Sequence, residues 1–244
     1  MTTEDTNRNY QSFDFLNVLG QIFLAVFVGS TAFVFGSTSA DIEYGNSTTT
    51  VHVSDVNPIA VDFYAILTSI IIAVIQGESL TAFRVFRHDT KLVPTLYRLP
   101  LNIASSIFAI LHLIALINHP TTENVNAFTN FYSWISIIIA VGYAIQTLFT
   151  LFSVFFPRNS KHLKEGFHPA HKVYSNSLFA LTVLQIFIGM AFYSQALGEC
   201  YANFTCENDV DVLLNVSMIC LLGYGLITST VSINSHWRVS NNDD

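Results

Sequence analysis

Six long apolar stretches divide this sequence, and they restrict its fold more than any other feature. They lie at about residues 15–36, 58–83, 99–118, 129–156, 173–196 and 211–235. A helix needs about 20 mostly apolar residues to cross roughly 30 Å of hydrocarbon, so each stretch is long enough to span a bilayer. Backbone groups in lipid must be hydrogen-bonded internally, which a helix achieves. The sequence therefore predicts an all-α membrane protein, a compact bundle of six transmembrane helices in which short loops place successive helices antiparallel and adjacent.

The composition agrees with a chain that lies mostly in lipid. Charged residues make up 11% of the sequence and hydrophobic residues 51%, whereas a soluble domain carries roughly 25% charged residues. The formal net charge of −7 comes from loops and tails and gives no basic surface for nucleic acid. The polar start does not resemble a secretory signal, so the first helix is expected to remain as an anchor. We expect a cytoplasmic tail over 1–14, a transmembrane domain over 15–235 and a second cytoplasmic tail over 236–244.

The basic residues indicate the orientation of the bundle. All ten lysines and arginines fall in the two predicted tails, or at and between the second and third helices and the fourth and fifth. The loops 37–57, 119–128 and 197–210 contain none. Loops rich in Lys and Arg face the cytoplasm, so we expect both termini to be cytoplasmic. The segment KHLKEGFHPAHK before the fifth helix is expected to be a solvated cytoplasmic loop.

The loops assigned to the outside carry two features of chains that enter the secretory pathway. Asn46 and Asn203 each begin an Asn-X-Thr sequon and are the predicted glycosylation sites. Cys200 and Cys206 share the last external loop, where an oxidising compartment allows a disulfide, and two free thiols are the alternative. We expect an integral protein of the plasma membrane or of a vesicle or lysosome membrane.

Polar residues inside the predicted spans are costly in lipid and often mark a functional site. Glu78 lies near the cytoplasmic end of the second helix, where Arg84 or Arg87 can neutralise it. His112 lies deep in the third helix and needs a partner, either hydrogen bonds in the core or a metal or haem. The full set of these polar residues is Asp62, Tyr64, Glu78, Asn102, His112, Gln146, Asn176, Gln185 and Asn215.

Three segments carry a family resemblance. QGESLTAFRVFRHDTK closes the second helix, FYSW opens the fourth and FHPAH opens the fifth. In this order and spacing they resemble the cytochrome b561 family over about residues 58–196. The resemblance implies a four-helix core that holds two haems b, one near each face, and passes electrons across the membrane. It also implies ascorbate as the cytoplasmic donor, ferric iron or monodehydroascorbate as the external acceptor, and a homodimer.

The resemblance also places four haem-ligand positions. The outer pair, on the second and fourth helices, falls on Tyr64 and Tyr132, and the inner pair, on the third and fifth, falls on Arg98 and His171. Only His171 keeps the histidine that would bind the metal. The arginine guanidinium stays protonated and offers no lone pair to iron. The inner site is left with a five-coordinate haem on His171, or with no haem and with Arg98 and His171 making hydrogen bonds instead.

The outer positions leave alternatives open as well. Tyrosinate binds haem iron in catalase, but a phenol has a pKa of about 10 and ionises only with help. The alternative is a hydrogen bond between Tyr64 and Tyr132. His112, at a similar outer depth, is an alternative ligand, although it does not fall on a family ligand position.

The donor side keeps more of the resemblance. Lys91 matches a basic position that the family places near its cytoplasmic ascorbate pocket, and Lys164 is a candidate for another. Together with Arg84, Arg87 and Arg98, these residues would attract a small anion from the cytoplasm. The alternative is that they only satisfy the positive-inside rule.

These substitutions favour a cytochrome b561-like membrane protein with degenerate haem sites, depleted of haem and acting as a binding or scaffold subunit for a second copy or another membrane protein. Two alternatives stay open. One is a transmembrane oxidoreductase that passes electrons from cytoplasmic ascorbate to an external acceptor through a non-standard haem. The other is a small transporter or sensor that uses the vacated cavities.

Overall fold

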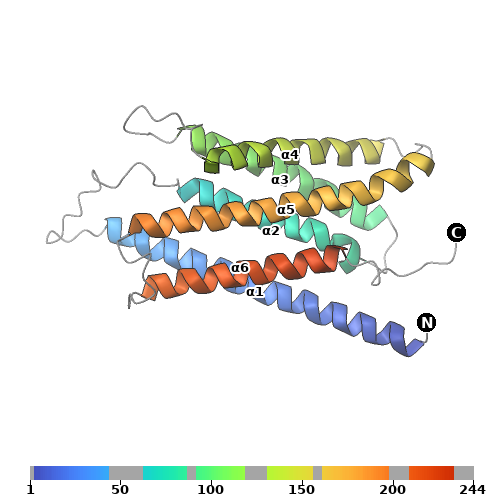
Figure 1. Cartoon of the computed structure of the whole chain (residues 1–244), viewed down its shortest axis with the longest axis horizontal. Coiled ribbons are helices and arrows are strands. Elements are labelled where there is room, and N and C mark those ends of the chain that lie inside the picture. The colour runs from blue at the N-terminus through green and yellow to red at the C-terminus, as the bar shows by residue number, and fades with distance from the viewer. Residues whose placement is uncertain are drawn as a thin grey trace.

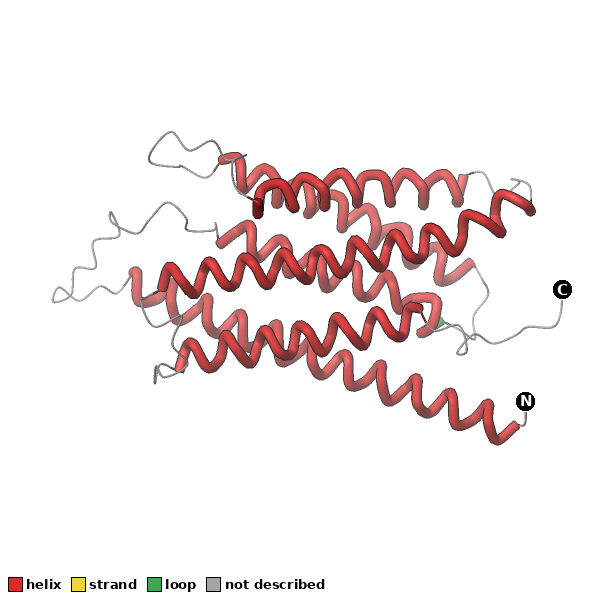
Figure 2. Tube along the Cα trace, viewed as in Figure 1, coloured by secondary structure: helices red, strands yellow, loops and turns green. Residues whose placement is uncertain are grey.

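The computed structural model describes residues 3–43, 63–86, 92–118, 131–155, 161–197 and 209–233. Every regular element in these ranges is an α-helix (Figures 1 and 2). The six helices are α1 (Thr3–Glu43), α2 (Phe63–Val85), α3 (Leu92–Asn118), α4 (Phe131–Phe155), α5 (Lys161–Leu197) and α6 (Asp209–Ile233). Each contains a stretch long and apolar enough to cross a membrane. The prediction of an all-α protein with six transmembrane helices is confirmed.

Two helices extend further than their apolar stretches predict. The apolar part of α1 is Phe13–Phe35, but the helix begins at Thr3, within the predicted polar tail. The apolar part of α5 is Ala170–Ala191, but the helix begins at Lys161, so the predicted loop KHLKEGFHPAHK is helical. Hydropathy marks only the part of a helix that lies in hydrocarbon. Polar residues outside the bilayer can continue the same helix, because many of them have good helix propensity.

The six helices form three layered pairs, α1 with α6, α2 with α5, and α3 with α4 (Figure 1). Between the pairs, α2 packs on α3 and α4 packs on α5, so α2 to α5 close into a four-helix ring. On the other side of that ring, α6 packs on both α2 and α5. The first helix is the exception to the predicted adjacency of successive helices, since its principal partner is α6.

Successive helices run in opposite directions along the bundle. The start of α1 and the end of α6 therefore lie at the same end, together with the ends of α2 and α4 and the starts of α3 and α5 (Figure 1). We call this the inner end, because the basic residues of the sequence gather beside these helix termini. The opposite end is the outer end. Which side of a membrane each end faces remains a prediction from the positive-inside rule.

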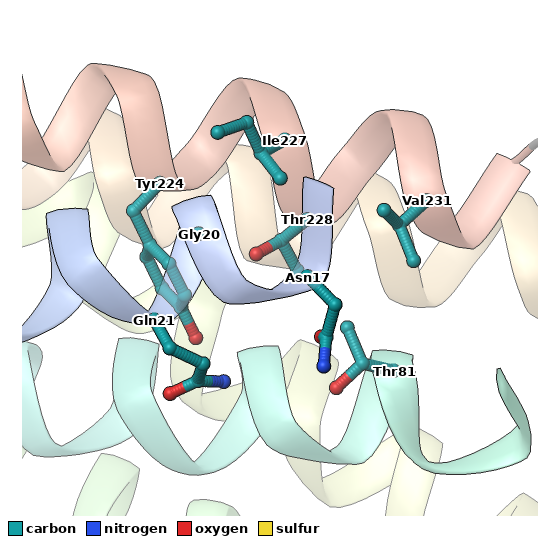
Figure 3. Close-up of a pocket in the computed structure, with 8 residues that line it drawn as sticks. All are labelled: Asn17, Gly20, Gln21, Thr81, Tyr224, Ile227, Thr228 and Val231. Carbon is teal, nitrogen blue, oxygen red and sulfur yellow. The ribbon is translucent and has the colours of Figure 1, made fainter. Parts of the chain in front are cut away.

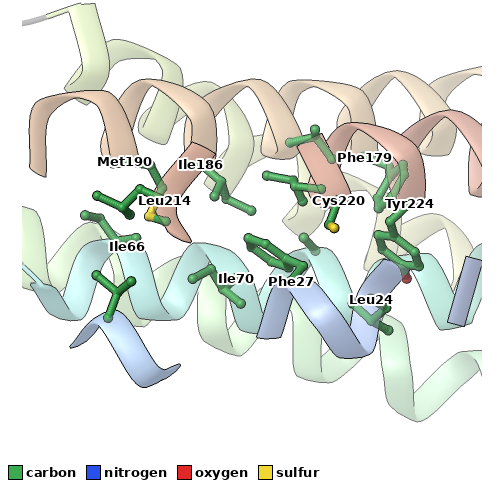
Figure 4. Packing of buried hydrophobic residues seen from close by; sticks show 14 of the residues in the cluster. Leu24, Phe27, Ile66, Ile70, Phe179, Ile186, Met190, Leu214, Cys220 and Tyr224 are labelled. Atoms are coloured by element: carbon green, nitrogen blue, oxygen red, sulfur yellow. The ribbon is translucent and has the colours of Figure 1, made fainter. Parts of the chain in front are cut away.

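A large apolar core joins the α1–α6 pair to the ring. It includes Phe27, Ile66, Phe179 and Met190, all less than 2% exposed, and the free thiol of Cys220 (Figure 4). A second, smaller core lies inside the ring itself. Its members are Ile72, Ala109, Ile135, Ile139, Ala140, Tyr143 and Leu178.

Candidate functional site

A column of buried polar side chains lines the interior of the four-helix ring. On each helix these residues recur at spacings of three, four or seven, which keeps them on one face. Hydrogen bonds between the helices of the ring show that many of them are turned inward. The column comprises Ser69, Gln76 and Ser79 on α2, Arg98, Asn102, Ser105 and His112 on α3, Tyr132, Ser136, Tyr143, Gln146 and Thr150 on α4, and His171, Ser175, Thr182 and Gln185 on α5. Such residues are rare in lipid, so the polar column is the candidate functional site.

His112 is the centre of the outer part of the polar column, and it is 1% exposed. Its Nδ1 atom lies 2.8 Å from the Ala65 carbonyl oxygen and 3.1 Å from Thr68 Oγ1, both on α2. Its Nε2 atom lies 3.0 Å from Ser136 Oγ on α4 and 2.7 Å from Gln185 Nε2 on α5. One imidazole therefore contacts all three other helices of the ring.

These partners fix the protonation of His112. A carbonyl oxygen only accepts hydrogen bonds, so the Nδ1 atom must carry the proton that it donates to Ala65. The Nε2 atom then accepts from the amide of Gln185. Ser136 donates its own proton to the Tyr132 carbonyl oxygen at 2.9 Å and lies 2.5 Å from the same Gln185 amide nitrogen. His112 is thus a neutral imidazole with both ring nitrogens in hydrogen bonds.

Tyr132 fills the space beside His112. It is 2% exposed, and the two rings meet edge to face with their centroids 6.1 Å apart. The phenol lies against Gly189 on α5, where an added Cβ atom would come within 3.2 Å of Tyr132 Oη and of an Ile66 side-chain carbon. The absence of a side chain at Gly189 is what admits the phenol between α2, α4 and α5.

Asn102 organises the inner part of the polar column. Its Oδ1 atom accepts hydrogen bonds from Ser79 Oγ at 2.9 Å and from Gln146 Nε2 at 3.2 Å. Its Nδ2 atom donates to Thr150 Oγ1 at 3.0 Å. Asn102, Ser79 and Gln146 are each at most 1% exposed. A single amide on α3 therefore holds α2 and α4 in register.

At the inner end of the column, Arg98 Nη2 donates to Ser175 Oγ at 3.3 Å, which joins α3 to α5. His171 lies one turn before Ser175 on α5 and is partly buried. Next to it, Lys172 Nζ donates to the Ile233 carbonyl oxygen at 2.9 Å. A lysine at this place satisfies a carbonyl left free at the end of α6. Cationic side chains therefore tie the inner ends of three helices together.

The four helices of the ring are also the part of the chain that matches a known family. The family model of eukaryotic cytochrome b561 matches residues 63–195. This match covers more than half of the chain and runs from the start of α2 almost to the end of α5. The chain belongs to the cytochrome b561 family. The resemblance over about 58–196 is therefore confirmed at nearly the same bounds.

Curated relatives agree with this family assignment. The chain is 26% identical over 166 residues to the transmembrane ascorbate-dependent reductase CYB561 of Sus scrofa, which covers 67% of this chain and 64% of the relative. The proteins of the same name from Mus musculus and Homo sapiens are 25% and 26% identical over 168 residues, covering 67% of this chain and 65% and 64% of theirs. The chain thus spans less than two thirds of the length of these relatives.

The structure separates the two histidines that it describes in full. His112 pairs with Gln185, which lies 14 residues beyond His171 on α5. At about 1.5 Å per residue this is about 21 Å along the helix, so His112 and His171 cannot hold one metal ion together. Among the described residues no group of three or more His, Cys, Asp or Glu side chains is placed to bind a metal.

Several predicted site residues lie outside the part of the chain whose side chains are described. For Tyr64, Arg84 and Lys164 the backbone belongs to a helix and the side chain is not described. The b561-type ascorbate site and the outer ligand pair therefore stay predictions, as do the glycans and the disulfide. The residues that lie wholly outside the described ranges are Asn46, Arg87, Lys91, Cys200, Cys206 and Asn203.

Glu78 has a partner that the sequence did not indicate. Its Oε1 atom accepts a hydrogen bond from Gln21 Nε2 on α1 at 2.8 Å. Gln21 also lines a small pocket between α1, α2 and α6 in the inner half of the bundle (Figure 3). The residues that line this pocket are Asn17, Gly20, Gln21, Thr81, Tyr224, Ile227, Thr228 and Val231. Sequence reasoning missed Asn17 and Gln21 because the first helix was treated only as an apolar anchor.

Proposed function

We propose that this chain is a haem-depleted member of the cytochrome b561 family that acts as a binding or scaffold subunit in the membrane. The observation that carries the proposal is that polar side chains inside the ring form hydrogen bonds from one helix to another. His112 on α3 bonds to Gln185 on α5 and to Ser136 on α4, and Asn102 on α3 bonds to α2. The resemblance places two haems in this same interior. The polar column gives the four helices a set of internal contacts that does not require a cofactor.

The outer half of the ring does not fit a haem ligand set. An axial imidazole needs a free nitrogen lone pair, but both nitrogens of His112 are engaged by protein groups. Turning His112 toward an iron would leave the Gln185 amide without this acceptor, and an unsatisfied buried group costs about 1–3 kcal/mol. The position on α4 that the resemblance assigns to a ligand is Tyr132, which packs against His112 and Gly189.

The inner half offers one imidazole at a family position. The resemblance pairs His171 with the position of Arg98, whose guanidinium has no lone pair for iron. Arg98 instead donates to Ser175. A pair of neutral imidazoles, as the resemblance requires, is therefore absent from both described halves of the column.

The middle of the ring supports the same proposal through its packing. Ile72, Ile139 and Tyr143 are 1% exposed and pack together between the two polar parts of the column. Interiors packed in this way leave few voids larger than a water molecule. A macrocycle that reached this middle layer would have to displace several of these side chains.

The scaffold role assigns partner binding to the surfaces that the ring does not use. The external loops carry the predicted glycans at Asn46 and Asn203. The outward faces of α3 and α4 are apolar, with Ile107 and Ile138 about half exposed, and they suit lipid, a second copy of the chain or another membrane protein.

A transmembrane ascorbate-dependent reductase with a non-standard haem is the second candidate. It is favoured by the activity named for the relatives. It is also favoured by four basic residues that lie in the sequence near helix termini of the inner end, Lys91, Lys164, Arg84 and Arg87. A transporter or sensor is the third, and the polar column favours it. In the middle of the column, Ile72, Ala109 and Ile139 pack around Tyr143, whose hydroxyl bonds to Thr182, and this close packing argues against a continuous path.

Iron and haem content test the proposal. The full chain is expressed with an excess of haem precursor, purified in mild detergent, and assayed for iron per chain and for haem extracted with pyridine. We expect less than about 0.1 haem per folded chain. A content near one or two haems per chain would support the reductase and contradict the scaffold proposal.

A further inference from the structure

Gln76 is an unusual residue within the polar column. Its side chain is completely buried on α2, yet neither its Nε2 nor its Oε1 atom has a hydrogen-bond partner among the described residues. Ser105 Oγ on α3 and Gln146 Oε1 on α4 are likewise buried and without a partner in that part of the chain. Native proteins leave few buried polar atoms unsatisfied, so four of them require an explanation.

These atoms lie at one level of the ring. Ser79 on α2 and Asn102 on α3 are joined by a hydrogen bond. Gln76 lies one turn before Ser79, and Ser105 lies one turn after Asn102. Because α2 and α3 run in opposite directions, both displacements lead toward the outer end (Figure 1). Gln76 and Ser105 therefore occupy the same layer. Each lies on the same helix face as its neighbour in the Ser79–Asn102 hydrogen bond, so the two face each other between α2 and α3.

Gln146 reaches the same place from α4. Its Nε2 atom donates to Asn102 Oδ1, which positions the other end of the amide, Oε1, beside this layer. On the outer side, Ile72 and Ala109 close the layer with apolar groups. We call the layer formed by the polar groups of Gln76, Ser105 and Gln146 the inner chamber.

We propose that the inner chamber is a binding site for internal water, holding one or two molecules hydrogen-bonded to Gln76, Ser105 and Gln146. The donors and acceptors decide the class of ligand. The set contains the NH₂ group of Gln76 together with the oxygens of all three residues. A cation would satisfy only the oxygens, and an anion only the donors. Water satisfies both, and buried waters in proteins make about three such bonds.

The chamber divides the ring into two chemically different halves. Water bound there extends the hydrogen-bond network of Asn102 toward the middle of the membrane. The side chains of Ile72 and Ala109, together with the Tyr143 and Thr182 hydroxyls that bond to each other, then separate it from His112 and its hydrogen-bond partners. The inner half is hydrated and the outer half is dry.

The sign of a stability change tests the proposal. Gln76→Met keeps the volume of the side chain and removes its polar atoms. If water is bound, the variant leaves that water short of partners, and the thermal unfolding midpoint in detergent falls by roughly 5 °C. If Gln76 is dry, removing unpaired polar atoms raises the midpoint, and such a rise, or no change, overturns the proposal. Ile72→Met, one turn away on the same face, is the control and should shift the midpoint by less.

Infrared difference spectroscopy gives a second readout on folded protein, and it decides the matter if Gln76→Met fails to fold. An O–H stretching band of internal water should shift when bulk H₂¹⁶O is exchanged for H₂¹⁸O. Ser105→Ala, a small change, should abolish that band, whereas Ala109→Ser should leave it in place. Absence of the band from the wild type, or its persistence in Ser105→Ala, overturns the proposal. Neither readout depends on haem content, so this inference and the proposed function can fail separately.

Discussion

Gln185 Nε2 lies 2.7 Å from His112 Nε2 and 2.5 Å from Ser136 Oγ, so one amide group on α5 holds α3 and α4 together. Little water reaches this depth of a membrane, so solvent does not readily replace the amide donor. The hydrogen bond between Gln185 and His112 is therefore a structural link across the ring. It also commits the imidazole of His112 to a hydrogen-bonding role.

Replacing Gln185 by leucine should destabilise the bundle. Gln185→Leu leaves His112 Nε2 and Ser136 Oγ without the amide donor, and we expect a loss of about 2–4 kcal/mol in the free energy of unfolding. Thermal unfolding of the purified protein in detergent measures this loss. Leu184→Ala is the control, because Leu184 is 49% exposed on the lipid-facing side of the same helix. Equal shifts in the two variants would show that the His112 link contributes little.

Gly77 is expected to tolerate no side chain. It lies on α2 in the segment QGES, and an added Cβ atom would overlap the hydroxyl of Tyr224 on α6. Gly77→Ala should therefore cost about 1–3 kcal/mol through overpacking between α2 and α6. Tyr224→Phe removes the overlapping oxygen, so the double variant Gly77→Ala with Tyr224→Phe should recover part of the loss in a thermal unfolding assay.

Gly29 provides the matched comparison for Gly77. It is also a helical glycine, on α1, but nothing lies within 4 Å of its added Cβ atom. Gly29→Ala should leave stability unchanged or raise it slightly, since alanine has the better helix propensity. If Gly77→Ala behaved like Gly29→Ala, the close packing of α2 and α6 would be refuted.

Arg98→His should create a haem site at the inner end. The variant would place an imidazole on α3 at the position that the family resemblance pairs with His171 on α5, so it would restore the implied ligand pair. We expect a gain of about one haem per chain over the wild type, measured by absorbance and by haem extraction. Arg98→Lys, which offers no imidazole, should gain none.

The dependence on His171 completes this test. Arg98→His combined with His171→Ala should lose the gained haem, because one ligand of the pair is again missing. If Arg98→His bound no haem while remaining folded, the alignment of α3 with the family ligand position would be wrong.

The number of helices and their approximate positions could be predicted from the sequence, because a bilayer imposes a length and an apolar composition on every span. The starts of α1 and α5 could not. Thr3 and Lys161 begin helices through polar residues that carry no hydropathy signal. The pairing of α1 with α6 also escaped prediction, since it depends on how two distant apolar faces fit together.

Only some residues of the candidate site could be predicted from the sequence. Asn102, His112, Gln146 and Gln185 stand out as polar residues inside spans, and all four belong to the polar column. Their partners do not stand out. Ser136, for example, is an ordinary residue for a membrane helix, and its role depends on the rotation and depth of α4 relative to α3 and α5. Those relations between helices are set by packing that one sequence does not reveal. The three-and-four spacing from Tyr132 to Thr150 was the signal available for the whole face.

An absorbance spectrum of the detergent-purified full chain, oxidised and then reduced with ascorbate, tests the central claim most directly. The account predicts a flat visible spectrum from folded, helical protein, with no Soret band and no change on adding ascorbate. A Soret band with sharp α-bands that appear on reduction by ascorbate would contradict it. That result would show that the chain binds haem that ascorbate reduces, and it would restore electron transfer as the function.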